Sequence, residues 1–215
     1  MSDSAYFVAP PGRAGRGLLL LHSWWGLTPF CRGLADRLSD EGFTVLAPDL
    51  NIGEVFDREE EARRHLEAAD PNHLARLVLS SAHLLAERAQ GDRLTVVGMS
   101  MGASLGLWAS VRLPDVVEAV VSLYGTQAVD FEGSRARYQL HFADSDHLVS
   151  DDDAVFMEST MSLCGLAVES HRYAGTSHWF FEEGRPEYDA KAAAEVWERM
   201  IGFLKPVEGS ETDTR

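Results

Sequence analysis

The sequence has few of the features that mark secreted, metal-binding and membrane proteins. It has two cysteines, Cys31 and Cys164, and neither lies in a spacing typical of zinc ligands or of a disulfide framework. Its longest apolar run, residues 17–21, is far too short to cross a bilayer. Residues 1–4 include neither a basic group nor an apolar stretch, so we expect no signal peptide, no membrane association and a cytoplasmic location.

Basic residues are also scarce, since 19 lysines and arginines face 34 acidic residues and the net charge is −15. This balance disfavours nucleic acids, anionic membranes and polyanionic substrates as partners. The length of 215 residues suits one α/β domain with a substantial core. We expect that domain to span residues 1–206, followed by a polar, disordered tail at 207–215.

The most informative stretch of the chain is residues 98–102, which spell Gly-Met-Ser-Met-Gly. Residues 93–97 are typical of a buried strand, and residues 103–112 are typical of a helix. A G-x-S-x-G turn between a strand and a helix is the signature of a nucleophile elbow, which exposes the serine hydroxyl on a strained turn. We therefore interpret Ser100 as a nucleophile; the alternative is a small-residue turn that packs a helix against a sheet.

Strand and helix patterns alternate along the chain. Short apolar runs predict strands, and helix start signals such as Thr28-Pro29 and Asp70-Pro71 precede the helical stretches. The predicted strands are residues 6–8, 18–21, 43–47, 94–97, 117–123, 138–142 and 168–173. The predicted helices are residues 29 to about 42, 71 to about 90, 103–112, 151–163 and 187–204, with an exposed helix or loop at 54–70. The alternation predicts a doubly wound, mostly parallel α/β sheet of about seven strands flanked by helices.

A nucleophilic serine needs a base, and the base needs an acid that orients it. In an open α/β sheet these groups gather at the carboxyl ends of the strands, and enzymes with this elbow carry the acid and then the histidine after the serine. Asp146 follows the predicted strand that ends at residue 142, and His178 follows the one that ends at residue 173. The pattern predicts a triad of Ser100, Asp146 and His178, with Asp144 as the alternative acid.

Acyl transfer also requires backbone donors for the oxyanion. The start of the helix after the elbow offers free N–H groups, the first of them at Met101. Residues 22–26 follow the strand where such enzymes place the second donor. We assign the oxyanion hole to the backbone N–H groups of Met101 and Trp24, and the indoles of Trp24 and Trp25 either line the site or belong to the core.

Together these segments resemble the dienelactone hydrolase family over nearly the whole chain. The matching family motifs are H-E-x-x-G at residues 22–26, A-P-D-L at 47–50, G-x-C-x-G at 98–102, Y-G at 124–125, H-x-G-x-x-D-x-x-V at 141–149 and Y-x-x-x-x-H-x-F at 173–180. The resemblance implies the α/β-hydrolase fold and hydrolysis of a small-molecule carboxylic ester or lactone without a cofactor. It also implies Asp146, rather than Asp144, as the acid.

Three residues depart from the family pattern. Ser100 stands where the family often has a cysteine nucleophile, and Ser23 stands where it has a glutamate. In the cysteine enzymes that glutamate is thought to help activate the thiol. A serine that uses His178 as its base does not need this glutamate, so the first two changes are consistent with each other. The third departure is Glu182, which stands where family members that act on dienelactone have a carboxylate-binding arginine.

The third departure bears on the substrate. An unpaired carboxylate at Glu182 would repel an anionic substrate, so a neutral, apolar ester or lactone is favoured over dienelactone itself. Candidate replacements for a second family arginine are Arg58, Arg63 and Arg64. The predicted pocket residues are Ser23, Trp25, Tyr124, Trp179, Phe180 and Glu182, together with the Trp24 indole. For each aromatic ring the alternative is core packing.

Two other classes of function stay open at this point. One is a non-catalytic protein of the same fold that binds a small ligand or a partner, since fold and function can separate. The other is a metal hydrolase, suggested by Asp144, Asp146 and the acidic run 151–153 with His141 and His147. Because that run is typical of a helix N-terminus, we expect no metal.

Overall fold

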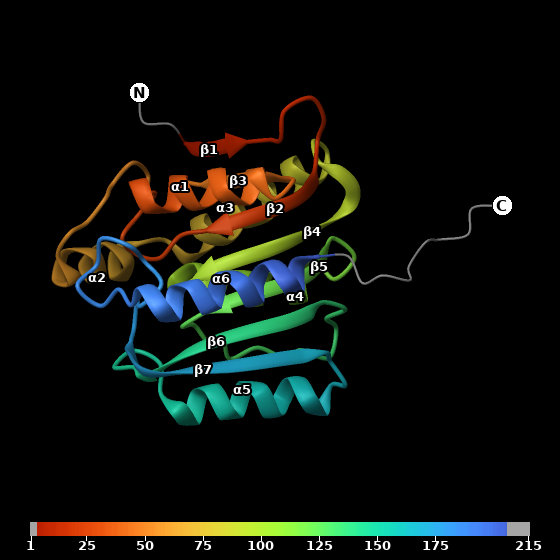
Figure 1. Cartoon of the computed structure of the whole chain (residues 1–215). Helices are drawn as coiled ribbons and strands as arrows, with labels where there is room; N and C mark the ends of the chain where they lie inside the picture. Colours follow the sequence, from red (N-terminus) through yellow and green to blue (C-terminus); the bar gives the residue numbers. More distant parts are fainter. Residues whose placement is uncertain (1–3, 206–215) are drawn as a thin grey trace.

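The computed structural model describes residues 4–205, and in it seven strands form one sheet in the order β1-β3-β2-β4-β5-β6-β7 (Figure 1). The strands are β1 (Ala5–Val8), β2 (Arg16–Leu21), β3 (Phe43–Pro48), β4 (Gln90–Met99), β5 (Val117–Leu123), β6 (Arg137–Ser145) and β7 (Val168–Ser177). The helices are α1 (Pro29–Asp40), α2 (Glu59–Ala68), α3 (Pro71–Ala86), α4 (Met101–Arg112), α5 (Asp151–Leu163) and α6 (Ala190–Leu204). Only β1 pairs antiparallel among these strands, so the predicted doubly wound, mostly parallel sheet is confirmed. The tail predicted at 207–215 lies outside the described residues.

The central strands are apolar throughout because helices cover both faces of the sheet. Side chains alternate along a strand, so Leu18 and Leu20 of β2 face one way and Leu19 and Leu21 the other. The first pair lies in a core cluster with residues of α1 and α6, and the second in a cluster with residues of α3, α4 and α5. Figure 1 shows α6 crossing in front of the sheet, with α1 beside it. Helices therefore cover both faces of the sheet.

The predicted helix starts are observed where capping residues stand. Thr28 accepts a hydrogen bond from the Cys31 N–H at the start of α1, and Asp70 accepts one from the Asn72 N–H at the start of α3. The two largest differences from the predicted helix boundaries are in α3 and α6. Helix α3 ends at Ala86, because Gln90 already pairs with β2, and α6 begins at Ala190, after its cap Asp189. The exposed segment 54–70 holds α2.

Strands β6 and β7 are longer than the sequence pattern predicted. They continue to Ser145 and Ser177, so Asp146 and His178 directly follow paired backbone. Ser145 and Ser177 are partners in the register, which brings the next residue of each strand to one point at the edge of the sheet.

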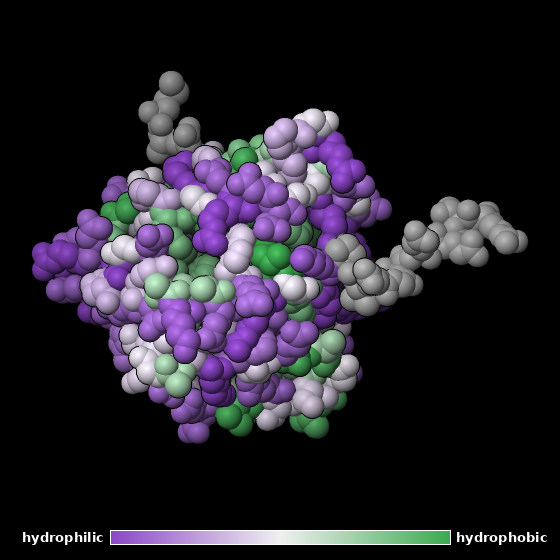
Figure 2. Space-filling view, viewed as in Figure 1, coloured by the Kyte–Doolittle hydropathy of each residue, from purple (hydrophilic) through white to green (hydrophobic). Residues whose placement is uncertain are grey.

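The surface is polar, as the composition suggests. Hydrophilic residues cover most of the face in Figure 2. Both cysteines are free thiols. Among the helices within residues 4–205, none is long and apolar enough to cross a membrane.

Candidate active site

The turn between β4 and α4 has the geometry of a nucleophile elbow. Ser100 has a φ of 52°, in the left-handed region that favours glycine, and its N–H donates to the Leu123 carbonyl at 2.9 Å. A Cβ on Gly98 would lie 2.4 Å from the Gly102 carbonyl oxygen, and one on Gly102 would lie 2.2 Å from the Leu21 carbonyl oxygen. Both glycines are therefore required by close backbone contacts on either side of the serine.

The Ser100, His178 and Asp146 side chains form one hydrogen-bonded chain. Ser100 Oγ lies 2.8 Å from His178 Nε2, and His178 Nδ1 lies 2.7 Å from Asp146 Oδ2. The His178 and Asp146 side chains are only 1% and 6% exposed. The hydroxyl can donate to Nε2 while Nδ1–H donates to the carboxylate, which is the tautomer that a general base requires. The alternative acid, Asp144, is exposed and accepts from the Gly175 N–H instead.

Asp146 is held as an ion. Burial alone raises the pKa of its carboxyl. Hydrogen bonds from His178 and from the N–H groups of Leu148 and Val149 outweigh burial, so the pKa of Asp146 lies below its ordinary value. A fixed carboxylate at this position orients the imidazole and stabilises its charged form.

Both predicted oxyanion donors are unused in the described part of the chain. Neither the Met101 nor the Trp24 N–H donates to another group of residues 4–205. The backbone of Trp24 is held at its carbonyl group, which accepts a hydrogen bond from Asn51 Nδ2 at 2.8 Å. Free donors on a fixed backbone are what stabilisation of an oxyanion requires.

His22 fixes the same loop. The Leu50 N–H donates to His22 Nε2 at 2.9 Å, and His22 Nδ1 lies 2.6 Å from the Ser23 carbonyl, to which it donates. Burial lowers the pKa of His22 to about 4, so the ring is neutral and can both accept and donate. The segment 49–51 and the loop after β2 thus form one rigid unit.

Three indoles form an aromatic wall beside His178. The ring centroids of Trp24, Trp25 and Trp179 lie 5.0 to 5.8 Å apart, and the Trp179 ring lies 4.8 Å from that of His178. All three are largely buried. Phe180 has no exposed surface and packs between Tyr124 and Tyr173, so the structure places it in the core.

The expectation that Glu182 is an unpaired carboxylate facing the substrate is wrong. The residue is 4% exposed, and it accepts hydrogen bonds from Ser23 Oγ at 2.9 Å and from the Tyr124 hydroxyl at 3.0 Å. Burial raises the pKa of its carboxyl from the ordinary 4.5 to about 7, against the opposing effect of those two bonds and of Arg185. The neighbours are distant in sequence, which is why the sequence pattern could not reveal them.

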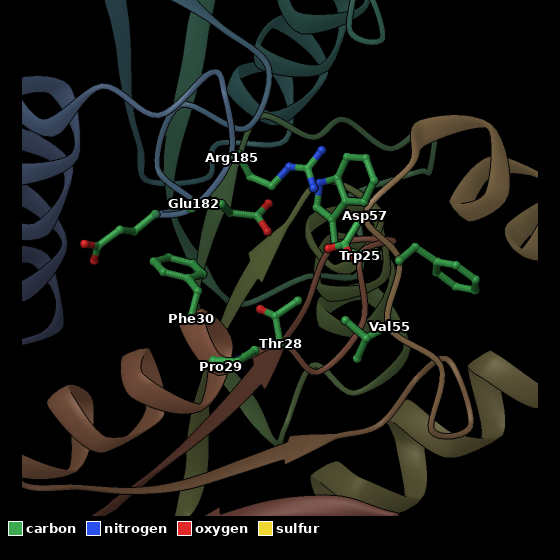
Figure 3. Close-up of a pocket in the computed structure, with 11 residues that line it drawn as sticks. Trp25, Thr28, Pro29, Phe30, Val55, Asp57, Glu182 and Arg185 are labelled. Carbon is green, nitrogen blue, oxygen red and sulfur yellow. The ribbon is translucent and has the colours of Figure 1, made fainter.

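A cavity of about 270 Å³ adjoins Trp25 and Glu182. Figure 3 shows it between Phe30, Val55 and these two residues, with Arg185 above them. The Arg185 guanidinium lies 3.5 Å from the centroid of the Trp25 ring, a cation–π contact. The sequence analysis did not include Arg185 among the residues near the site. The available signal was its position, since it is a basic residue seven positions after His178.

The three arginines proposed as carboxylate ligands lie elsewhere. Each is largely exposed and forms an ion pair with a glutamate of α2 itself. The residues are Arg58, Arg63 and Arg64, with Glu61, Glu67 and Glu60 as their partners. The glutamates neutralise the three arginine charges, so no substrate carboxylate is needed to pair with them.

The groups behind the metal hypothesis are spread apart. The Tyr173 hydroxyl donates to Nδ1 of His141, and Nε2 of the same ring donates to the Gln139 side chain. Burial lowers the pKa of His141 to about 3. The acidic run 151–153 forms the first turn of α5, next to its cap Ser150. Within residues 4–205, no three histidine, cysteine or acidic side chains are grouped so that they could hold a metal ion.

Comparisons with known proteins match nearly the whole chain. A model of the dienelactone hydrolase family matches residues 4–208. A protein of Aquifex aeolicus (strain VF5), provisionally named a carboxymethylenebutenolidase, is 27% identical in an alignment 211 residues long that covers 93% of this chain and 91% of that protein. A dienelactone hydrolase-like promiscuous phosphotriesterase from metagenomic libraries has a TM-score of 0.80 at 22% identity, over 93% of this chain and 90% of that one. Esterase 2 of Thermogutta terrifontis, phosphoramylated by tabun, has a TM-score of 0.71 at 16% identity, over 93% and 88%.

Proposed function

Since the chain belongs to the dienelactone hydrolase family, which supports a hydrolytic enzyme, we propose that it cleaves neutral carboxylic esters or lactones through a serine acyl-enzyme. The observation that carries the proposal is the hydrogen-bonded chain from Ser100 through His178 to Asp146 at the elbow. The esterase among its structural neighbours supports the same class of reaction.

In the first half-reaction Ser100 Oγ attacks the carbonyl carbon while His178 Nε2 takes its proton. The carbonyl oxygen becomes an oxyanion, and the N–H groups of Met101 and Trp24 donate to it. The carbon–oxygen bond to the alcohol then breaks, and His178 returns the proton to the leaving oxygen. Asp146 keeps Nδ1 protonated and stabilises the imidazolium between these two transfers.

In the second half-reaction water attacks the acyl-enzyme. His178 takes a proton from the water and gives it to Ser100 Oγ as the ester bond to the enzyme breaks. The acid product leaves and the resting hydrogen bonds are restored. A lactone follows the same path, except that its alcohol stays joined to the acid.

The surroundings of Ser100 favour an uncharged substrate. The indoles of Trp24, Trp25 and Trp179 pack together beside His178, and such aromatic surroundings suit apolar groups. Carboxymethylenebutenolidase, the name of the Aquifex aeolicus relative, implies the anionic dienelactone as substrate. The arginines of α2 are engaged in ion pairs, so a substrate carboxylate would have to compete with glutamates for them.

Labelling with a fluorophosphonate tests the proposal directly. The probe should attach to Ser100, as shown by peptide mass spectrometry, and should abolish hydrolysis of p-nitrophenyl butyrate. Ser100→Ala should fold, escape the label and lose about 10⁶ in kcat, the loss measured for serine proteases. A protein that neither reacts with the probe nor hydrolyses esters would instead be a non-catalytic binding protein of this fold.

A further inference from the structure

A buried glutamate lies beside the triad but has no part in the proposed chemistry. Glu182 accepts from two hydroxyls, Ser23 Oγ at 2.9 Å and Tyr124 at 3.0 Å, and has only 4% of its surface exposed. Burial of a carboxylate is costly unless its hydrogen bonds compensate for the lost water. A chain that needed only packing here would be more stable with an apolar side chain, so the carboxylate indicates a role in the site.

Each of the two hydroxyls belongs to a residue next to the reacting groups. Ser23 immediately precedes Trp24, whose N–H is one of the proposed oxyanion donors. The Tyr124 ring packs against the His178 ring, with centroids 4.9 Å apart. Glu182 lies four residues after His178 in the same loop, so it joins the end of β2, the end of β5 and the loop after β7.

The connection holds this loop from the side opposite to segment 49–51. His22 and Asn51 hold the carbonyl groups of Ser23 and Trp24 from the side of segment 49–51. Glu182 holds the Ser23 side chain from the side of the histidine. Glu182 thus links the loop that carries the oxyanion donor to Tyr124, which packs against the base.

We propose that Glu182 is a positioning residue, which aligns the Trp24 N–H with Ser100 and His178 through its hydrogen bonds to Ser23 and Tyr124. The inference rests on the proposed ester hydrolysis. Glu182 does not touch the reacting atoms in this scheme. It acts through two hydroxyls, so its hydrogen-bonding capacity matters more than its charge.

The experiment separates hydrogen bonding from charge and from folding. Glu182→Gln keeps the shape and can bond both hydroxyls, because its amide accepts from one and donates to the other. Glu182→Leu removes both bonds. Glu183→Gln, at the exposed neighbour, is the control for charge. Each variant is assayed for kcat and KM with p-nitrophenyl butyrate, and its Tm is measured.

We expect Glu182→Leu to lower kcat by about 100-fold with little change in KM, the effect of a donor misplaced by about 1 Å. Glu182→Gln should retain kcat within about tenfold of the wild type, and Glu183→Gln should match the wild type. A Glu182→Leu variant that folds and keeps the wild-type kcat would overturn the inference. So would a Glu182→Gln variant that loses as much activity as Glu182→Leu.

If Glu182→Leu does not fold, Ser23→Ala and Tyr124→Phe carry the test, since each removes one of the two bonds and leaves the carboxylate in place. Each should lower kcat about tenfold, and wild-type kcat in both would overturn the inference. Fluorophosphonate labelling of the wild type separates the two failures. Absence of labelling at Ser100 would refute the proposed function. Labelling at Ser100 together with wild-type kcat in the Glu182 variants would refute the positioning role alone.

Discussion

Glu182→Gln should make the stability of the protein less dependent on pH. In the folded chain burial raises the pKa of this carboxyl to about 7, against an ordinary value of 4.5. The folded state therefore keeps the Glu182 proton up to a higher pH than the unfolded state does. The resulting contribution to stability is fully present below pH 4.5 and is lost as the pH rises to about 7. Glutamine has no such proton.

The magnitude follows from the two pKa values. Their difference, at about 1.4 kcal/mol for each pH unit, amounts to about 3 kcal/mol. Most of this loss falls between pH 5 and pH 8. The free energy of unfolding of the wild type should therefore fall by about 2 to 3 kcal/mol more than that of Glu182→Gln over the same interval. A constant offset from the imperfect fit of the amide does not affect this difference.

Urea unfolding of both proteins at pH 5 and pH 8 measures the effect, with Glu183→Gln as the control. Glu183 is exposed, so its variant should follow the wild type. If the free energies of unfolding of Glu182→Gln and of the wild type change by the same amount between the two pH values, burial does not raise the pKa of Glu182. The account of its surroundings would then be wrong.

Three other outcomes follow from the site. Asp146→Asn should lower kcat by about 10⁴ by favouring the wrong His178 tautomer, and Asp144→Asn should have little effect; the reverse order in an esterase assay would identify Asp144 as the acid. Neutral p-nitrophenyl acetate should have a higher kcat/KM than dienelactone, and a preference for dienelactone would reveal cations that reach the site. Gly102→Ala should lower the Tm because its Cβ would meet a carbonyl oxygen at 2.2 Å, whereas Gly33→Ala in α1, with open space around it, should leave the Tm unchanged or raise it.

The order of the elements could be predicted because each depends on nearby residues. The cap Thr28, Gly98 of the elbow and the apolar run of β5 act through near neighbours in the chain. The end of α3 could not be predicted in this way, because it is set by the pairing of Gln90 with β2. The lengths of β6 and β7 depend in the same way on their mutual register.

Within the site, the contact of His178 with Asp146 could be predicted because parallel strands bring their carboxyl ends to one edge. The surroundings of Glu182 could not. Its partner Ser23 is 159 positions away, and nothing near Glu182 in the sequence indicates that its side chain is turned inward. A carboxylate that was expected to repel a substrate is therefore a hydrogen-bond acceptor beneath the site.

The left-handed backbone at Ser100 has a consequence for protein engineering. Tyr124 and Trp179 share this conformation, with φ of 40° and 68°, and both pack against His178. Each such residue stores about 1–3 kcal/mol of backbone strain. Glycine would release this strain at Ser100, whereas at Tyr124 and Trp179 the cavity left by the buried ring would cost more. A library screened for heat resistance alone would therefore enrich glycine at position 100 and discard the nucleophile. Selections for a more robust variant should hold Ser100 constant and diversify the helix surfaces instead.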